Sequence, residues 1–454
     1  MNPYKIALVE AVSERTHVYS RTYLPRVGLA TMAALLKNNG YDCDLWIKPM
    51  TREEKERLAG YDLVGIGSLS NTIGEAYKLA DFLRQKGTPV VMGGPHVSFL
   101  PEEALGHCDW VVRGEGEQTL LSMVRMLAAG ERPNGLKGVS YKNGENAFQH
   151  NEKHATVDLA EIPSPDFSLS PQVNGADIPP IVITSRGCPH DCSFCSVTSI
   201  FGRKYRFKSH DQVISELRPV RHRSVCFGDD NFCANPVRAK SLMREMIQKD
   251  AVPLRWSGQV CVSAASDNEL LELMEATRCR VVYVGIESVN PETLKKYGKV
   301  HTVDAVRQSV ENLHRHNIGI HGMFVIDSTD PPETARNIVD YALETDIDTI
   351  QVFSITPFPG TRAYAENKER LIHRQWDKYD GMHVVVKPEK CSAHTMQMAI
   401  VNEMKRFYSL KNTLFSYRAN RGWRVKYRLG GNLLVRKWIR ENSGYIERLK
   451  NLAA

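Results

Sequence analysis

The chain has 454 residues, enough for two or three domains with separate cores. Its 42% apolar and 24% charged residues are ordinary values for a globular protein and argue against a disordered or fibrous chain. No segment is apolar over the length of a membrane span, and the first residues lack the plan of a signal peptide, so we expect a cytoplasmic protein. The ten cysteines are then expected as thiols rather than disulfides.

Residues 1–135 alternate short apolar runs with amphipathic helical patterns, which predicts an α/β domain with a doubly wound, Rossmann-like sheet. The expected strands occupy residues 6–9, 43–47, 63–67, 90–93 and 110–113. A ligand crevice is expected beyond their carboxyl ends. Glycines follow the last three of these strands, but glycine also serves simple tight turns, so glycine alone indicates a binding site only weakly.

Residues 136–180 contain many prolines among polar residues and are expected to form a linker with a small hairpin. Six further strands are then expected, at residues 181–184, 224–227, 254–262, 280–285, 319–326 and 349–354. Helical patterns follow all but the last of them. Residues 181–385 therefore predict a partial (β/α)6 barrel of the TIM type, with its chemistry at the carboxyl ends of the strands.

Three cysteines, Cys188, Cys192 and Cys195, follow the first barrel strand, and no fourth cysteine lies nearby. A 4Fe–4S cluster usually takes four thiolates, whereas a structural zinc site closes with a fourth Cys or His. His190 is too close in sequence to two of the cysteines to complete a zinc site comfortably. We therefore favour a cluster with one open iron and keep structural zinc as the alternative.

This CxxxCxxC motif, with Phe194 before the last cysteine, resembles that of the radical S-adenosylmethionine (radical SAM) superfamily. The resemblance implies that the three cysteines bind a 4Fe–4S cluster and that its open iron chelates S-adenosylmethionine. Cleavage of S-adenosylmethionine would then yield a 5′-deoxyadenosyl radical. Phe194 would lie beside the adenine, and the further S-adenosylmethionine contacts would come from strand ends: Asp229, Asp230, Asn231, Gln259 and Glu287.

Several of these residues also have simpler explanations. Aspartates after a strand often cap the next helix, and a glutamine at a strand end is often satisfied internally. The turn at 327–330 departs from the glycines common in relatives, which could reshape the substrate pocket. A second cluster built from the other barrel cysteines, Cys226, Cys233, Cys261 and Cys279, is a minor alternative, since cysteine often serves as a small buried apolar residue.

The front region resembles the cobalamin-binding domain of one large radical SAM class, whose members include radical methyltransferases. Three segments carry this resemblance: Pro25-Arg26-Val27-Gly28-Leu29, Gly93-Gly94-Pro95-His96 and Val112-Arg113-Gly114-Glu115-Gly116-Glu117. The resemblance implies that the nucleotide tail of cobalamin would lie against Ser68, Leu69, Ser70, Gly93 and Gly94. The Asp-x-His-x-x-Gly motif that supplies a lower cobalt ligand in many such domains is missing, and His17 is the only histidine in the corresponding loop.

The tail, residues 386–454, is expected to be helical and carries the positive charge of the chain. From residue 405 onward, thirteen Lys and Arg residues stand against two acids, Glu441 and Glu447. We expect a helical cap whose apolar face packs on the barrel while its cations stay solvated. Peripheral contact with a membrane, combined with a lipid-like substrate, is the second interpretation, and nucleic-acid binding is the least favoured.

The resemblance predicts a radical enzyme that methylates an unactivated carbon of a small-molecule or lipid-like substrate with the help of cobalamin. An electron donor such as flavodoxin or ferredoxin would reduce its cluster, and a second S-adenosylmethionine would remethylate the cobalamin. The alternative reaction is a radical dehydration, deoxygenation, cyclisation or carbon–carbon coupling without methyl transfer. A nucleic-acid-binding protein with a structural cluster is a third hypothesis, against which the open iron argues.

Overall fold

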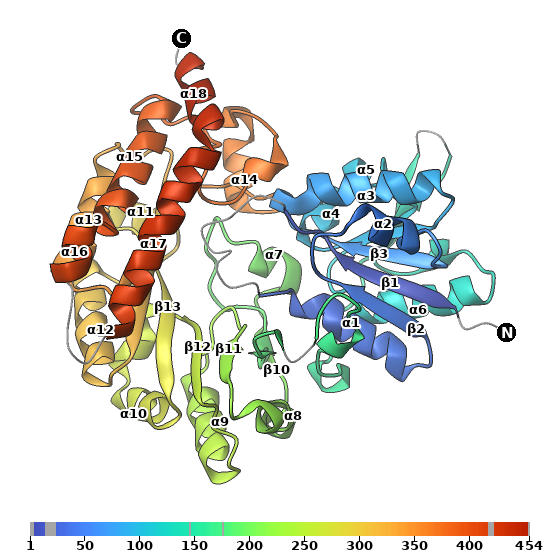
Figure 1. Ribbon diagram of the computed structural model, residues 1–454, viewed down its shortest axis with the longest axis horizontal. Coiled ribbons are helices and arrows are strands. Elements are labelled where there is room, and N and C mark those ends of the chain that lie inside the picture. Colours follow the sequence, from blue (N-terminus) through green and yellow to red (C-terminus); the bar gives the residue numbers. More distant parts are fainter. Residues whose placement is uncertain (1–3, 14–23, 145–146, 175–176, 416–421, 453–454) are drawn as a thin grey trace.

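The structure is a computed structural model that describes residues 4–13, 24–144, 147–174, 177–415 and 422–452. Two sheets lie side by side, each with its own helices, and a group of C-terminal helices lines the outer side of the second sheet (Figure 1). Within the described ranges, none of the helices combines the length and apolarity that crossing a bilayer would require.

The first sheet has seven strands in the order β2-β1-β3-β4-β5-β6-β7. Their bounds are β1 (Lys5–Glu10), β2 (Asp42–Trp46), β3 (Leu63–Gly67), β4 (Val90–Gly93), β5 (Trp110–Val112), β6 (Val139–Lys142) and β7 (Phe148–His150). The first five are parallel, and their order confirms the predicted doubly wound sheet. The hairpin predicted after residue 135 corresponds to β6 and β7, which continue this sheet as antiparallel strands.

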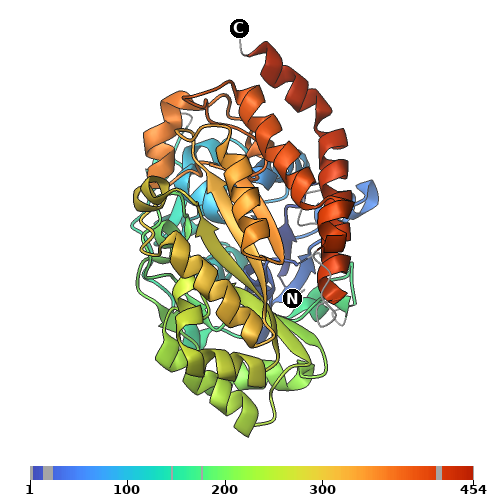
Figure 2. The ribbon, with the colours of Figure 1, turned by 90° about the vertical axis from the view of Figure 1, so that its left-hand side faces the viewer.

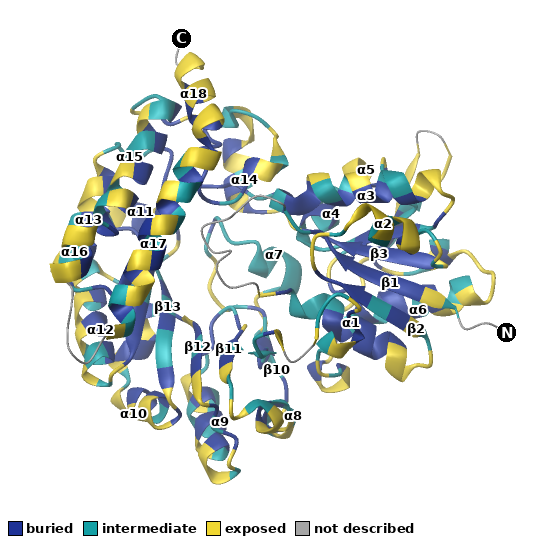
Figure 3. Ribbon diagram, viewed as in Figure 1, coloured by how far each residue is buried: buried dark blue, intermediate teal, exposed yellow. Residues whose placement is uncertain are grey.

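Helices cover both faces of this sheet, with the bounds α1 (Val27–Asn38), α2 (Arg52–Leu58), α3 (Ile73–Gln85), α4 (Pro95–Phe99), α5 (Pro101–Ala104) and α6 (Glu117–Ala128). Side chains alternate between the two faces of a strand. Ile6 and Leu8 of β1 therefore pack in the core with α1 and α6, whereas Ala7 and Val9 pack in the core with α2 and α3. The strands are accordingly buried between helices whose outer faces are exposed (Figure 3).

The second sheet has six parallel strands in the order β15-β14-β13-β12-β11-β8. Their bounds are β8 (Ile181–Val182), β11 (Ser224–Phe227), β12 (Arg255–Val260), β13 (Cys279–Glu287), β14 (Gly319–Ile326) and β15 (Thr349–Ser354). The order follows the chain without closing, because β8 and β15 remain the two edges. This arrangement confirms the predicted partial barrel.

The helices of the barrel are α7 (Val197–Phe201), α8 (His210–Leu217), α9 (Pro236–Gln248), α10 (Asn268–Ala276), α11 (Pro291–Lys296), α12 (Val303–Arg315), α13 (Thr334–Glu344) and α14 (Arg362–Asn367). A short antiparallel ribbon, β9 (Ser185–Arg186) with β10 (Arg206–Phe207), brackets the segment that contains the three cysteines. The barrel core is apolar, and side chains such as Val282 and Ile320 are completely buried in it.

The C-terminal region forms α15 (Ala393–Phe407), α16 (Leu410–Phe415), α17 (Gly422–Glu441) and α18 (Ser443–Asn451), which confirms the predicted helical tail. These helices form a layer along one side of the molecule (Figure 2). Met396, Ile400 and Met404 of α15 join the barrel core. The expectation that the cations of the tail stay solvated is wrong for Arg424 and Arg428, which are buried because they donate to backbone carbonyls in the turn before β15.

Candidate functional site

A cavity of about 290 Å³ lies between the two sheets, at the carboxyl end of the first one. The loops after β3, β4 and β5 form one wall. The opposite wall comes from the segment around the three cysteines, namely Ile183, Arg186, Ile200 and Phe201. The crevice expected from the strand pattern is therefore present, and residues of both regions line it.

Glycine keeps this cavity open. A Cβ atom added to Gly65 would lie 2.7 Å from Cδ2 of Leu8, and one added to Gly94 would lie 2.4 Å from the backbone oxygen of Ser68. Gly94 also has φ of +106°, a conformation that side chains disfavour. The buried Ser68 hydroxyl has no hydrogen-bond partner among the described residues. The cavity wall thus consists partly of backbone without side chains, next to a buried hydroxyl that lacks a partner. Such a wall fits a large polar ligand such as the nucleotide tail of cobalamin.

The structure places four of the five predicted cobalamin residues, Ser68, Leu69, Gly93 and Gly94, on the lining of this cavity. Ser70 is not among the lining residues. Its hydroxyl lies 3.0 Å from Nδ1 of the buried His96, whose Nε2 lies 3.2 Å from Oε1 of Glu103.

Because both of its ring nitrogens have partners in the structure, His96 is held in place and is not presented to the cavity as a ligand. His17, the histidine of the first loop, lies outside the described residues.

Two ion pairs connect the cavity to the segment that carries the cysteines. Arg186 Nη2 lies 2.5 Å from Oε1 of Glu117; the Glu117 side chain is buried, and that of Arg186 is 14% exposed. Arg206 forms a bidentate pair with Glu115, with one N–O distance of 3.0 Å. Arg186 is two residues before Cys188, so these pairs tie the cysteine loop to the first domain. An opposite charge at hydrogen-bonding distance offsets part of the desolvation cost of such little-exposed charges.

The three cysteines, Cys188, Cys192 and Cys195, occupy one short loop and are half-buried. The Cys195 amide donates to the Cys192 carbonyl at 3.1 Å, which keeps the loop compact. Burial raises the pKa of Cys195 to about 12 and also raises those of Cys188 and Cys192. These thiols must therefore lose protons when they bind iron, as thiolate ligands generally do.

Within the described part of the chain, no three His, Cys, Asp or Glu side chains converge as they would on a single ion. A 4Fe–4S cluster is larger than one ion, so its three thiolates can surround it without converging on one point. The donor set of three thiols in one loop therefore fits a cluster.

The two adjacent aspartates at the end of β11 lie in different surroundings. Asp229 is fully buried and accepts hydrogen bonds from the Thr184 amide at 3.1 Å, the Thr184 hydroxyl at 2.8 Å and the Ser185 hydroxyl. It thus ties β11 to the segment after β8 and does not face the cysteines. Burial, aided by the negative charge of Asp229, raises the pKa of Asp230 to about 7, and this carboxyl interacts electrostatically with Cys188 and Cys195.

Asn231 is also buried, and its side-chain oxygen has no partner among the described residues. Its side chain hydrogen-bonds the thiol of Cys261, just beyond β12, which is also bonded by His190 and Ser263. Burial disfavours the ionised thiol, but these bonds lower the pKa of Cys261 to about 7. Gln259, two residues earlier, has an exposed side chain, and its carbonyl accepts from the Phe232 amide at 2.8 Å.

Glu287, at the end of β13, pairs with a residue that sequence reasoning missed. Lys299 Nζ lies 2.8 Å from its Oε1 and also hydrogen-bonds the Cys192 sulfur. Burial alone would lower the pKa of Lys299, but the charges of Glu287 and Cys192 outweigh it and raise this pKa. Glu287 has φ of +68° at a break in the β13–β14 register, a strained conformation typical of functional sites.

Two predicted features remain, Phe194 in the cysteine loop and the acidic turn after β14. Phe194 packs edge-on against Tyr297, with ring centroids 5.0 Å apart, and joins a cluster beyond β15. In the acidic turn after β14, Asp327 Oδ1 accepts from Lys296 at 2.6 Å and Asp330 Oδ1 accepts from Thr293 at 2.9 Å. The turn is therefore bound to α11, which accounts for its acidic residues.

Two family models match the chain. The radical SAM superfamily matches residues 182–342, and the B12 binding domain matches residues 18–124. The chain is 32% identical to the uncharacterized methyltransferase PH0819 of Pyrococcus horikoshii, over 80% of this chain and 83% of the relative. It is 29% identical to the bacteriochlorophyllide d C-12(1)-methyltransferase of Chlorobaculum tepidum, over 77% of this chain and 75% of the relative.

Two solved structures share the fold. The radical S-adenosylmethionine methyltransferase TsrM of Kitasatospora setae, solved with cobalamin and a [4Fe-4S] cluster, superposes with a TM-score of 0.67 at 19% identity, covering 81% of this chain and 78% of TsrM. The cobalamin-dependent radical enzyme OxsB superposes with a TM-score of 0.73 at 15% identity, covering all of this chain and 78% of OxsB.

The cysteine loop and, apart from Leu8, the residues that line the cavity thus lie within the regions that the two family models match. The chain is an enzyme that belongs to the radical SAM superfamily, in the group whose members carry a B12-binding domain, and its cofactors are a 4Fe–4S cluster, S-adenosylmethionine and cobalamin.

Proposed function

We propose that this enzyme methylates an unactivated carbon atom of a small-molecule substrate. The observation that carries the proposal is the shared cavity, whose walls come from the glycine-rich loops of the first domain and from the segment that contains the cysteines. When bound, the cluster and S-adenosylmethionine supply the radical, and cobalamin supplies the methyl group. The glycine-rich loops would hold cobalamin, and the three cysteines would hold the cluster.

The residues of the barrel would then have distinct roles. Cys188, Cys192 and Cys195 would bind the cluster. Asp230 and Glu287 would accept hydrogen bonds from the amino group and the ribose of S-adenosylmethionine, since both carboxyls lie near the cysteines. Lys299 would position Glu287 and contribute a positive charge beside the Cys192 sulfur.

The names of several relatives support methyl transfer. Besides the two methyltransferases above, the hopanoid C-2 methylase of Rhodopseudomonas palustris is 26% identical over 63% of this chain and 54% of the relative. One relative favours the second candidate, a radical reaction without methyl transfer. The anaerobic magnesium-protoporphyrin IX monomethyl ester cyclase of Cereibacter sphaeroides is 25% identical over 89% of this chain and 70% of the relative.

The setting of the reaction is part of the proposal. We expect the enzyme to act in the cytoplasm, with a reduced flavodoxin or ferredoxin as electron donor. We also expect cluster assembly to require anaerobic conditions, because the cysteine loop is only half-buried.

The products of S-adenosylmethionine distinguish the two candidates without a known substrate. Anaerobically reconstituted enzyme with cobalamin and a reductant should release both S-adenosylhomocysteine, the product of methyl loss, and 5′-deoxyadenosine, the product of radical cleavage. Mass spectrometry would quantify both. Cys192→Ala should lose 5′-deoxyadenosine along with the cluster iron. Release of 5′-deoxyadenosine alone by the wild type would contradict methyl transfer and favour the cyclase-like reaction.

A further inference from the structure

Helix α17 is built with arginines on its inner side. Arg424 is completely buried and donates to the carbonyls of Asp346 at 2.9 Å and Ile347 at 3.2 Å, and to the Asp346 carboxylate at 2.7 Å. Arg428 donates to the carbonyls of Ile347 and Asp348 at 2.9 and 2.8 Å, and its guanidinium lies 4.4 Å from the ring centroid of Phe407. Polar contacts therefore join this helix to the turn before β15.

Val435 and Trp438 of α17 pack inward, but several other large apolar side chains of α16 and α17 face outward. Of the fourteen large apolar side chains that are exposed in the described part of the chain, six lie on these two helices. They are Leu410 (57% exposed), Leu414 (70%), Phe415 (79%), Tyr427 (57%), Leu429 (41%) and Leu433 (69%). Such a concentration on adjacent helices marks an interaction surface, since exposed leucines scattered singly need no explanation.

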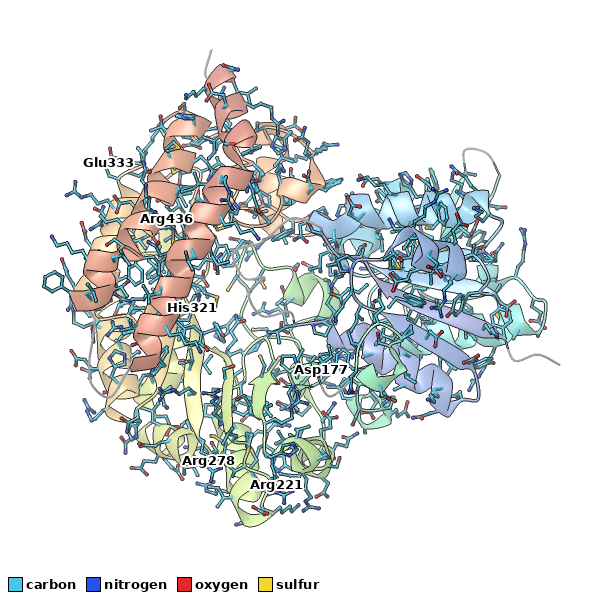
Figure 4. The ribbon with its side chains drawn as sticks, viewed as in Figure 1. Asp177, Arg221, Arg278, His321, Glu333 and Arg436 are labelled. Carbon is cyan, nitrogen blue, oxygen red and sulfur yellow. The ribbon has the colours of Figure 1, made fainter. Side chains whose placement is uncertain are left out.

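Cations are interleaved with these apolar residues. Exposed residues at positions 426, 429, 433, 436 and 440 recur at helical spacing and form one outward stripe, in which Lys426, Arg436 and Arg440 flank the two leucines. Arg436 is labelled on α17 in Figure 4, and exposed residues run along α16 and α17 in Figure 3. Lys411 is exposed on α16.

We propose that the exposed stripe of α16 and α17 docks on the surface of an anionic lipid membrane. Charge complementarity identifies this occupant, because four cations, Lys411, Lys426, Arg436 and Arg440, are exposed on α16 and α17, and Glu441 is the only acid in these two helices. Phosphate headgroups would pair with the cations while the leucines and Phe415 enter the region between headgroups and acyl chains. The proposal rests on this surface and is independent of the reaction proposed above.

The test is sedimentation of the full-length holoenzyme with vesicles of phosphatidylcholine alone or mixed with phosphatidylglycerol. Binding is expected to the mixed vesicles, to weaken as salt rises and to be weak on pure phosphatidylcholine. The double variant Leu429→Asp, Leu433→Asp should bind at least tenfold more weakly, and Lys426→Glu, Arg436→Glu should do the same. Val237→Asp, at a site 76% exposed on α9, is the matched control and should bind like the wild type.

Three outcomes would overturn the proposal. The wild type could fail to sediment with anionic vesicles, or both double variants could bind them as well as the wild type does. The surface could instead join two copies of the chain, in which case the wild type would form a dimer that the leucine variants dissociate, with no lipid binding. Unchanged iron content and circular dichroism would establish that the variants are folded, as expected for exposed positions.

Discussion

Substitution of Gly65 by valine tests whether the cavity between the two sheets holds cobalamin. Gly65 lies in β3 on the floor of the cavity, and the first carbon of a side chain there would already lie 2.7 Å from Leu8 Cδ2 and 3.6 Å from Val91 Cγ1. Valine suits a strand, so the backbone should tolerate it. Its two further methyl groups would occupy space that we assign to the cofactor.

Overpacking of a filled site costs about 1–3 kcal/mol, and each 1.4 kcal/mol corresponds to a tenfold change in affinity. We therefore expect Gly65→Val to bind hydroxocobalamin about 5-fold to 150-fold more weakly than the wild type. Equilibrium dialysis with absorption detection would measure the dissociation constant, and cobalt per chain would be counted after desalting. The cysteine loop is not touched, so the loss of iron should be much smaller than the loss of cobalt.

Gly74→Ala on α3 is the matched control, because a Cβ atom at Gly74 meets no heavy atom within 4 Å. It should bind cobalamin like the wild type. If Gly65→Val bound cobalamin with unchanged affinity, the cofactor would not occupy this cavity. The cavity between the two sheets could then not be the site of methyl transfer.

Three further predictions concern the barrel. Glu287→Gln and Lys299→Met should each weaken S-adenosylmethionine binding at least fivefold in equilibrium dialysis without loss of iron, because each removes one partner of a buried ion pair; unchanged affinity would exclude both residues from the site. Asp230 has a pKa of about 7 in the folded protein, above its usual value of 3.8. The folded state thus holds this proton more tightly than the unfolded chain. In the cofactor-free protein the contribution of Asp230 to stability should therefore fall as pH rises from about 4 to about 7. Asp230→Asn should raise the melting temperature more at pH 8 than at pH 5. An equal effect at both pH values would refute the assignment. Arg424→Met should lower the free energy of local unfolding of α17 by about 3 kcal/mol or more. Amide hydrogen exchange in that helix should then be at least 100-fold faster. Unchanged exchange would show that the buried arginine does not stabilise the attachment of α17.

Much of the architecture could be predicted from the sequence, because the signals were local. Apolar runs alternating with amphipathic patterns predicted both parallel sheets, as the structure confirms. The spacing of Cys188, Cys192 and Cys195 predicted a cluster loop, which stays a prediction. The small residues after β3 and β4 were correctly placed at the crevice, apart from Ser70, whose hydroxyl is directed to His96.

The interactions that complete the site join distant segments, so no local pattern reveals them. Lys299 follows Glu287 by twelve residues across α11, and only the fold brings it back to the cysteine loop. Asp229 and Asp230 are adjacent in sequence yet face different surroundings, because neighbouring side chains after a strand point in different directions. The burial of Arg424 depends on carbonyls in a turn 78 residues earlier.

We expect the ion pair between Arg186 and Glu117 to make the loading of the two cofactors interdependent. Glu117 begins the helix that follows the cobalamin cavity, and Arg186 leads into the cluster loop. A ligand that orders one side of this pair lowers the entropy cost of ordering the other, so cluster assembly and cobalamin uptake should favour each other. A chain that lacks either cofactor should therefore also hold the other less firmly.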